Sequence, residues 1–591
     1  MLNNFKKFIY ILGDSKKNLF SLLSAFILTS AIEAIGIGLI GPFLSLALYP
    51  RAVQNIPIIN WIYQQSGIST TQYFIALIGL LIAVVFCFKA ILYFFLKSYI
   101  YKFIFSQKGS LCSKLLKAYL QAPYTFYLHK NTSQIISNIA IETDRFCYGY
   151  TLPLMEVLTN FLIVLSLVLL LAKTDIIFLV MASAVILPVF GLFYKLKDSF
   201  SYFGKEASEA RNEMVKIISH GVGGFKETRL IGCEEYFEVQ MSCQAHRHEI
   251  SESRFHSYQI IPKIAIETIL VIFLLTLVSA YQVLYQKEVQ TLIPTLSVFA
   301  VTAIRLIPAA STSIAGLGQL QSNGYSVKLI YYDLKELEKE RDNKSYIISN
   351  LQSIKDKFTF ENQVNIHKIA YRYPNVQNLA LCDISLKFKK GESIALIGKS
   401  GAGKTTLVDV ILGLLYPESG QITVDNISVY ENIRAWQNLI GYIPQTIFLT
   451  DDTIERNIAF GVPDNLIDST KLQKAIELAQ LTELIKQLPN GIQTTVGERG
   501  VRLSGGQRQR IGIARALYHE REILVLDEAT SALDNETESL VTDAIRALSG
   551  SKTIIIIAHR LSTIEHCDRV YILEFGRIVK SGNYNEVVAA M

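Results

Sequence analysis

The residues best suited to chemistry in this sequence form a glycine-rich run, Gly398-Lys399-Ser400-Gly401-Ala402-Gly403-Lys404-Thr405-Thr406. An apolar run, residues 393–397, precedes it and a helical pattern follows, which is the strand, loop and helix context of a phosphate-binding loop. The glycines let backbone N–H groups point inward at phosphate oxygens, and the positive end of the helix beginning near Gly403 faces them. We expect Lys404 to reach the β and γ phosphates of a nucleotide and Thr405 to hold Mg²⁺.

Two acidic residues, Asp527 and Glu528, end a second apolar run, residues 523–526. Asp527 is placed to orient Mg²⁺ and its waters, and Glu528 to polarise the water that attacks the γ-phosphate. A core strand with an acidic end is the weaker interpretation, because both motifs fall in one domain. The two motifs together predict hydrolysis of a nucleoside triphosphate.

A third motif, Leu503-Ser504-Gly505-Gly506-Gln507, opens the helical run 508–519. A helix N-terminus with two glycines and a serine hydroxyl is a second phosphate-binding device. Because one nucleotide has one triphosphate, the simplest use of two devices is that each copy of the chain closes over the nucleotide bound to another copy.

These motifs resemble those of the ATP-binding cassette (ABC) family, and the resemblance covers essentially the whole chain. It implies that residues 503–507 are the signature that completes the partner's site. It also implies that Gln445 senses Mg²⁺ and the membrane domain, and that His559 is the switch histidine. Residues 531–534 look like the dimer-contact loop, and Tyr373 looks like the aromatic residue that stacks on adenine.

Every motif of the family is intact, so the resemblance implies two hydrolytically competent sites in a homodimer that binds ATP and Mg²⁺. Glu528 and His559 are the expected catalytic residues, and Thr405, Gln445 and Asp527 are the expected Mg²⁺ ligands. The expected ATP-binding residues are Tyr373, Gly398, Lys399, Ser400, Gly401, Ala402, Gly403, Lys404, Thr405, Thr406, Gln445, Ser504, Gly505, Gly506 and Gln507.

The composition divides the 591 residues into two parts with different solvents. Apolar residues make up 50% of the chain and charged residues 18%, and the long uncharged runs crowd the first 320 positions. Beyond about Phe358 the sequence alternates like a soluble α/β protein. The net charge of +6 includes no Lys/Arg block with interleaved aromatic residues, so nucleic-acid binding is not expected. The seven cysteines lack CxxC spacing, which indicates neither a disulfide framework nor a zinc site.

Six stretches reach the roughly 20 apolar residues that a membrane span needs: about 19–48, 72–96, 152–172, 175–195, 260–283 and 291–318. The predicted fold class is therefore multidomain, with an all-α six-helix transmembrane domain in residues 1–330. The ABC resemblance makes this a type I exporter fold. A linker in residues 331–358 leads to an α/β P-loop NTPase domain in residues 359–591.

Lys and Arg residues are unevenly distributed over the connecting segments. They are concentrated on the N-terminal arm and in segments 97–145 and 195–254, whereas loop 49–71 and the turns near 173 and 287 carry one each. Because cytoplasmic segments carry the excess of Lys and Arg, both termini are predicted to be cytoplasmic. The expected location is the cytoplasmic (inner) membrane, where the chain crosses several times.

Two of the predicted cytoplasmic connections are far longer than a turn between helices requires. Structureless loops of that length are uncommon, so we expect the spans to continue into the cytoplasm as helices, with simple surface loops as the alternative. Turn-like breaks at residues 121–124 and 221–224 favour a short transverse helix at each midpoint. The ABC resemblance makes these the coupling helices, one of them placed on the partner's ATPase.

Ionisable residues inside the predicted spans are Glu33, Lys89, Glu156, Glu267 and Arg305. Such groups cost roughly 2.5–3.5 kcal/mol at mid-bilayer and usually face a bundle interior or a water-filled cavity. The forked donors of Arg305 suit a phosphate or carboxylate, so Arg305 either contacts substrate or pairs with Glu33 or Glu267. Lys89 is also a substrate candidate, although snorkelling toward an interface is the better interpretation for it.

Residues 57–65 mix bulky apolar and polar side chains with few charges. They predict either a short helix on the outer membrane surface, with Trp61 and Tyr63 at headgroup depth, or an ordinary packed loop.

Two further resemblances bear on what is transported. Residues 495–500 resemble a segment found in exporters. Residues 31–36, 42–43 and 305–308 resemble bacterial flippases for polyprenyl-diphosphate-linked oligosaccharides. This implies an amphipathic substrate from the membrane, a lipid-linked oligosaccharide or another glycolipid, whose phosphate head Arg305 contacts.

Two other functions remain open from the sequence. Export of hydrophobic drugs or lipids would need an aromatic, weakly charged cavity. An ATP-gated channel or regulator needs no ordinary turnover, and the intact Glu528 and His559 argue against it.

Overall fold

The computed structural model describes residues 2–13, 16–48, 50, 57–68, 70–174, 176–285, 293–348, 359–528, 535–558 and 564–588. The chain divides into two compact units, residues 1–122 with 130–339 and residues 123–129 with 340–591. The division between residues 339 and 340 falls inside the predicted linker, which is helical up to Ile348. The domain limits given above remain predictions.

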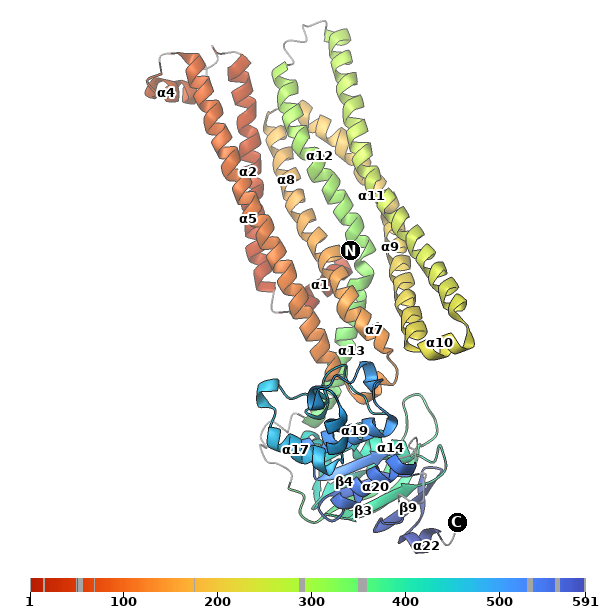
Figure 1. Cartoon of the computed structure of the whole chain (residues 1–591). Coiled ribbons are helices and arrows are strands. Elements are labelled where there is room, and N and C mark those ends of the chain that lie inside the picture. Colours follow the sequence, from red (N-terminus) through yellow and green to blue (C-terminus); the bar gives the residue numbers. More distant parts are fainter. Residues whose placement is uncertain are drawn as a thin grey trace. The chain divides into compact units, whose positions relative to one another are not determined.

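The described elements of the first unit are helices joined by short turns (Figure 1). Each predicted span lies largely within one long helix: α2, α5, α8, α9, α11 or α12. The helices are α1 (Leu2–Leu12), α2 (Lys16–Leu48), α4 (Pro57–Gln65), α5 (Thr71–Leu120), α7 (Thr132–Ser137), the π-helical η2 (Asn138–Glu142) and η3 (Arg145–Thr151), α8 (Leu152–Thr174), α9 (Ile176–Gly223), α10 (Phe225–Ile231), α11 (Glu234–Tyr285), α12 (Ile293–Ser322) and α13 (Gly324–Ile348).

Three of these helices are much longer than a membrane span. With 50, 48 and 52 residues, α5, α9 and α11 each reach about 75 Å at 1.5 Å per residue, against a hydrocarbon core of about 30 Å. The connecting segments are helical and not simple surface loops. That these helices extend membrane spans into the cytoplasm stays a prediction. Within the described residues, segments Thr71–Leu120 and Arg145–Ser166 are long and apolar enough to cross a membrane. The six-span topology stays a prediction.

Short helices occupy the two predicted breaks. After α5 ends at Leu120, α6 (Tyr124–Tyr127) follows, and its residues belong to the second unit. After α9 ends at Gly223, α10 follows and is terminated by Gly232, whose φ of +71° is the left-handed conformation that favours glycine at a helix end. The prediction of a short helix at each break is confirmed.

The predicted segment 57–65 is a helix, α4, and not a packed loop. The rings of Tyr63 and Phe74 meet edge to face at 5.0 Å, which fixes α4 to the start of α5. Trp61 remains 64% exposed. Its placement at headgroup depth stays a prediction.

The second unit contains two sheets, a mixed sheet with order β10-β9-β3-β8-β7-β6 and an antiparallel sheet with order β2-β1-β4-β5. Strands β3, β7 and β8 are buried at every residue, as central parallel strands covered on both faces are. The strands are β1 (Gln363–Tyr371), β2 (Leu381–Lys389), β3 (Ser393–Ile397), β4 (Ser419–Val424), β5 (Ile427–Ser428), β6 (Ile440–Ile443), β7 (Ile523–Asp527), β8 (Thr553–Ile557), β9 (Arg569–Glu574) and β10 (Arg577–Gly582).

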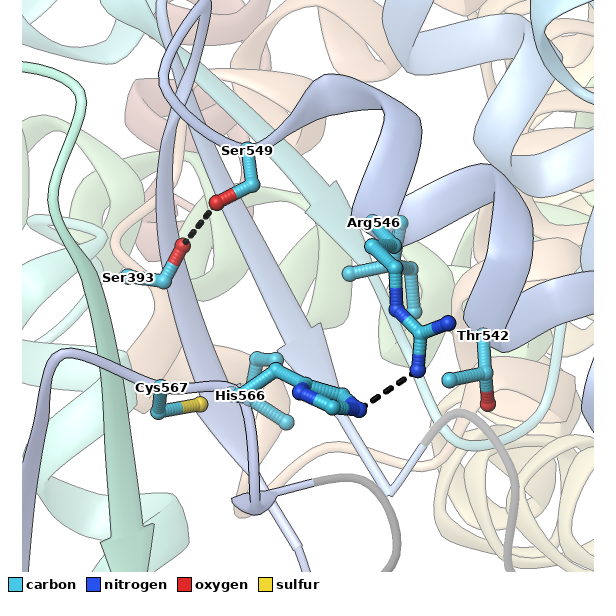
Figure 2. Close-up of a pocket in the computed structure, with 8 residues that line it drawn as sticks. Ser393, Thr542, Arg546, Ser549, His566 and Cys567 are labelled. Atoms are coloured by element: carbon cyan, nitrogen blue, oxygen red, sulfur yellow. Dashed lines mark hydrogen bonds between the residues drawn. The ribbon is translucent and has the colours of Figure 1, made fainter. Parts of the chain in front are cut away.

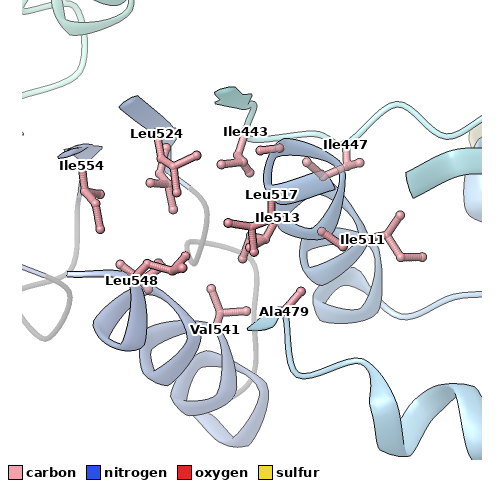
Figure 3. Close-up of a cluster of buried hydrophobic side chains, with 14 of the residues drawn as sticks. Ile443, Ile447, Ala479, Ile511, Ile513, Leu517, Leu524, Val541, Leu548 and Ile554 are labelled. Atoms are coloured by element: carbon pink, nitrogen blue, oxygen red, sulfur yellow. The ribbon is translucent and has the colours of Figure 1, made fainter. Parts of the chain in front are cut away.

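Helices cover the sheets of the second unit and supply its cores. In Figure 3, apolar side chains of α19 and α20 pack against strand residues such as Leu524 and Ile554. A second core fills the space between the two sheets and includes α14. Besides α6, the α-helices are α14 (Lys404–Ile411), α15 (Ile433–Leu439), α16 (Ile454–Ile458), α17 (Ser469–Leu478), α18 (Thr482–Gln487), α19 (Gly505–Tyr518), α20 (Asn535–Leu548) and α22 (Tyr584–Val588).

One buried carboxylate holds several elements of the first unit together. Asp333 on α13 is 6% exposed and accepts hydrogen bonds from the Tyr119 hydroxyl at the end of α5 and from the Asn138 side chain. Lys130 Nζ lies 3.1 Å from its other oxygen and 3.3 Å from Glu336. Because a buried charge needs partners, these donors fix α13 against α5 and η2.

We expect Asp333→Ala to lower the free energy of unfolding by about 3 kcal/mol, since the buried donors of Tyr119 and Asn138 lose their acceptor. Thermal unfolding of the full-length protein in detergent measures this loss. The control Glu336→Ala removes a half-exposed carboxylate and should cost less than about 1 kcal/mol. Equal melting temperatures for the two variants would contradict the account.

Candidate active site

The phosphate-binding loop connects the buried strand β3 to helix α14. Gly398, Gly401 and Gly403 have φ values of +157°, +79° and +100°. A side chain on Gly398 would place its Cβ only 2.2 Å from the Leu573 carbonyl oxygen, so only glycine fits there. The loop thus keeps its backbone N–H groups at the N-terminus of α14, as a phosphate site requires.

Lys404 begins α14 and folds back over the loop. Its ammonium donates to the carbonyl oxygens of Gly398 at 2.7 Å and Lys399 at 3.1 Å. Burial lowers the pKa of Lys404 below its usual range, while the nearby carboxylates of Glu528 and Asp527 act in the opposite direction. The predicted phosphate-binding cation and the two predicted acids therefore share one site.

The carboxyl ends of parallel strands bring the acids and Gln445 together. In the register of the sheet, Leu526 of β7 lies opposite Ile443 of β6. Gln445, two residues past the end of β6, donates from Nε2 to Glu528 Oε2 at 2.7 Å. Glu528 has a φ of +48°, a conformation that costs of order 1 kcal/mol for a residue with a side chain and is common at functional sites.

The predicted signature forms the N-terminus of α19. Ser504 is its N-cap: the Ser504 hydroxyl accepts from the Gln507 N–H, and the Gln507 side chain accepts from the Ser504 N–H at 2.9 Å. This capping box leaves the N–H groups of Gly505 and Gly506 without an intrahelical acceptor. Ser504 is exposed. In the part of the chain that the structure describes, no hydrogen bond or ion pair joins the signature to the phosphate-binding loop.

Gln509 is a residue that the sequence analysis missed. It is 6% exposed in the second turn of α19, and its Nε2 donates to the backbone oxygen of Gln445 at 3.2 Å. The signature helix and the glutamine beside Glu528 are thus in direct contact within one chain. A polar residue one turn after the signature, on the buried face of the helix, was the available signal.

Tyr373, the predicted adenine-stacking residue, lies beside the start of α14. Its hydroxyl is 3.1 Å from Thr406 Oγ1, and its ring meets Tyr371 edge to face at 5.1 Å. Tyr373 and the phosphate-binding loop are therefore neighbours, and the stacking role stays a prediction.

Two more residues near the acids were not predicted. The Tyr442 hydroxyl donates to Asp527 at 3.3 Å. Burial, together with the negative charge of Asp527, raises the pKa of Asp409 on α14 to about 6. Asp409 carries no motif, and only the packing of α14 beside β7 brings it near Asp527.

Other predicted residues fall partly outside the described part of the chain. His559 and residues 531–534 lie outside it, and Glu33 and Arg305 are described only as backbone of α2 and α12. Glu156 pairs with Lys97 at 2.8 Å. Glu267 is exposed on α11.

The snorkelling interpretation of Lys89 is wrong. Lys89 is 5% exposed, and its ammonium lies 4.8 Å from the centre of the Phe86 ring. Snorkelling would leave the ammonium at the surface, whereas here it is covered by neighbouring side chains.

A small cavity of about 40 Å³ in the second unit is separate from this site (Figure 2). It lies beside Ser393, the first residue of β3, whereas the phosphate-binding loop follows the last. Hydrogen bonds between Ser393 and Ser549 and between Arg546 and His566 border it. It has room for a few water molecules and is too small for a nucleotide.

Comparisons with known proteins agree with this geometry. A family model described as ABC transporter matches residues 381–531. The ATP-dependent lipid A-core flippase of Ralstonia nicotianae is 31% identical over 484 residues, 80% of this chain and 79% of that protein. The flippase of the same name from Cupriavidus metallidurans is 32% identical over 479 residues, 79% of this chain and 77% of that protein. The solved structure of a bacterial Atm1-family ABC exporter with ATP bound has a TM-score of 0.68 at 20% identity, covering 95% of this chain and 96% of that one.

The phosphate-binding loop, the two acids and the signature helix define the second unit as an ATP-binding cassette ATPase. The chain as a whole belongs to the ABC exporter family, in which its flippase relatives also fall. It is a half-transporter with the exporter fold, as predicted, and its ATP hydrolysis is coupled to transport at the inner membrane.

We expect Glu528→Gln to reduce ATP hydrolysis by about 10²–10⁴-fold, because the carboxylate next to Gln445 no longer accepts the proton of the attacking water. The phosphate assay is made on the full-length protein, with bound ATP measured in parallel. Glu522→Gln, just before the other end of β7, is the matched control and should keep its activity. Ordinary turnover by Glu528→Gln would exclude Glu528 as the base.

Asp409 predicts a pH dependence of stability. Because its folded pKa is raised from 3.8 to about 6, the free energy of unfolding should fall as the pH rises from about 4 to 6. Asp409→Asn removes this loss, so the nucleotide-free, metal-free protein should melt higher than wild type at pH 7.5 and nearly equally at pH 4. The exposed control Glu483→Gln should change neither value. A stabilisation that is the same at both pH values would refute the buried, raised-pKa environment.

Proposed function

We propose that two copies of this chain use ATP hydrolysis to move a lipid-linked oligosaccharide or another glycolipid across the inner membrane. The observation that carries the proposal is the 31% identity over 484 residues to a lipid A-core flippase. That alignment is about twice as long as residues 359–591, so it includes much of the membrane-spanning half and not the ATPase alone.

The substrate contacts are proposed on the membrane helices. Arg305 on α12 is a forked cation suited to a phosphate head. Glu33 on α2 and Lys89 on α5 are the further candidates, and the burial of Lys89 agrees with a place inside the helix bundle. Both termini are proposed to lie in the cytoplasm, following the excess of Lys and Arg on the N-terminal arm.

The residues at the nucleotide site fit ATP with Mg²⁺. The Thr405 hydroxyl, the Asp527 carboxylate and the Gln445 amide oxygen are the hard donors that Mg²⁺ prefers, and the hydrogen bond to Glu528 uses the Gln445 nitrogen. Bound Mg²⁺ would neutralise phosphate charge. Lys404 would exchange its two carbonyl acceptors for phosphate oxygens, and Glu528 would orient and deprotonate the water, with His559 as its catalytic partner.

A second copy is proposed to complete each site. The exposed Ser504 with Gly505 and Gly506 offers a free helix N-terminus to a nucleotide held elsewhere. The tip of the α9–α10–α11 region adds a second surface, because Phe225, Leu230 and Ile231 are 65%, 88% and 75% exposed. Apolar side chains this exposed on one short helix fit a protein interface, here the partner's ATPase unit.

Transport by reconstituted vesicles tests the substrate. Vesicles containing the wild-type protein and ATP should translocate a labelled lipid-linked oligosaccharide, and Glu528→Gln vesicles should not. Arg305→Ala should lower transport at least tenfold, because the phosphate head loses its bidentate partner, while Arg305→Lys should lower it less. ATP-dependent movement of a hydrophobic dye, with none of the glycolipid, would favour a drug or lipid exporter instead.

A further inference from the structure

An apolar cavity of about 240 Å³ lies in the first unit where α1, η3, α8 and α12 meet. Asn4 is the polar residue of its lining, and the apolar residues are Phe5, Tyr150, Leu154, Val157, Leu317 and Leu320. The cavity opens to the surface of the unit, and its lining is almost entirely apolar, so hydrocarbon is a better occupant for it than water.

The cavity is bounded by two close helix contacts. A Cβ on Gly316 of α12 would lie 2.6 Å from Val157 of α8, and a Cβ on Gly149 of η3 would lie 2.5 Å from Asn323. These glycines hold α12 close to its neighbours on either side of Leu317 and Leu320. The cavity lies beside η3, which is a π-helix, and π-helical turns are frequent at functional sites.

Helix α1 forms the remaining wall and is firmly attached. Phe8 is fully buried, with its ring 5.7 Å from that of Tyr150, and the ammonium of Lys7 donates to the Tyr332 hydroxyl at 3.0 Å. Phe5 nevertheless remains 39% exposed although it lines the cavity. Lys6, the next residue, is exposed. Lys6 does not line the cavity; its side chain is exposed on α1 at the position that follows Phe5.

The cavity also lies at the depth where lipid chains meet headgroups. Leu154 is near the start of predicted span 152–172, and Leu317 is near the end of predicted span 291–318. Exposed Lys16 and Lys17 begin α2, and they follow the opposite end of α1 from Phe5. Basic side chains beside an apolar surface at this depth attract anionic lipids.

We propose that this cavity binds one acyl chain of an anionic phospholipid from the cytoplasmic leaflet, with the lipid phosphate near Lys6. The inference rests on the proposed function for its membrane orientation. The site differs from the proposed substrate contact, because Leu317 is about 18 Å along α12 from Arg305 at 1.5 Å per residue. The bound lipid fastens α1, and α1 is attached through Lys7 to α13, the helix that crosses the division between the two units.

Tryptophan quenching tests the site in the full-length protein. Phe5→Trp, made with Trp61→Phe and purified in neutral detergent, is titrated with phosphatidylglycerol whose short acyl chains carry bromine. The quenching of tryptophan fluorescence should saturate as the concentration of the brominated lipid rises. Leu317→Phe, which narrows the cavity at its α12 wall, should weaken binding severalfold, and the exposed-site variant Lys6→Glu about threefold or more. Leu81→Phe and Lys102→Glu, at exposed positions of α5, are the matched controls and should change nothing.

Competitors identify the ligand. Brominated phosphatidylcholine should bind several-fold more weakly, and inorganic phosphate should not compete. Equal binding by Leu317→Phe, or by the two phospholipids, would overturn the proposal. Saturation by a lipid-linked oligosaccharide with none by phosphatidylglycerol would also overturn it. Transport is measured separately, so vesicles that flip the glycolipid while no phosphatidylglycerol binds would refute this inference and leave the proposed function standing.

Discussion

In the proposed function, the charge of one triphosphate is enclosed between two helix N-termini, and this is the constraint on which the rest of the transporter would depend. In the second unit, Gly403 is the N-cap of α14, and Gly505 and Gly506 are the first residues of α19, so glycines lie at the N-terminus of both helices. Gln445 links the acid after β7 to the signature helix: its side chain donates to Glu528, and its backbone oxygen accepts from Gln509 of α19. Lys404 meanwhile donates to two carbonyl oxygens of its own loop. If the signature completes a partner's site, then the closure of two copies also assembles the hydrolytic site. Gln445 contacts both Glu528 and the signature helix, so closure would act on it directly.

The first unit contains long helical elements that would carry a displacement over a large distance. Helices α5, α9 and α11 are each about 75 Å long, so a displacement at one end is carried along hydrogen-bonded backbone and not through a loop. Asp333 fixes α13 to α5 and η2 by buried hydrogen bonds. Lys7 and Tyr332 attach α1 to another face of α13. The helix that leads from α12 toward the ATPase is therefore held on two sides.

Short sequence patterns predicted those features of the structure that depend on residues close together in the chain. The phosphate-binding loop, the acids after β7 and the short helices at the two chain breaks follow from glycine, apolar periodicity and span length. Parallel pairing of β6 and β7 then accounts for the meeting of Gln445 and Glu528. What the sequence could not give depends on packing between distant segments: the raised pKa of Asp409, the contact of Gln509, the burial of Lys89, and helix α1 with its cavity. A lysine pattern alone does not distinguish a snorkelling side chain from one enclosed by a neighbouring helix.

Complementation between two inactive copies tests the central claim most directly. Lys404→Ala removes the phosphate cation and Ser504→Arg blocks the signature, so neither variant should trap nucleotide alone. A mixed dimer contains one site with an intact loop from one copy and an intact signature from the other. We predict that co-purified mixed dimers regain ATP-dependent nucleotide trapping at about half the wild-type amount. Trapping by Ser504→Arg alone, or none in the mixed dimer, would contradict a site shared between two copies.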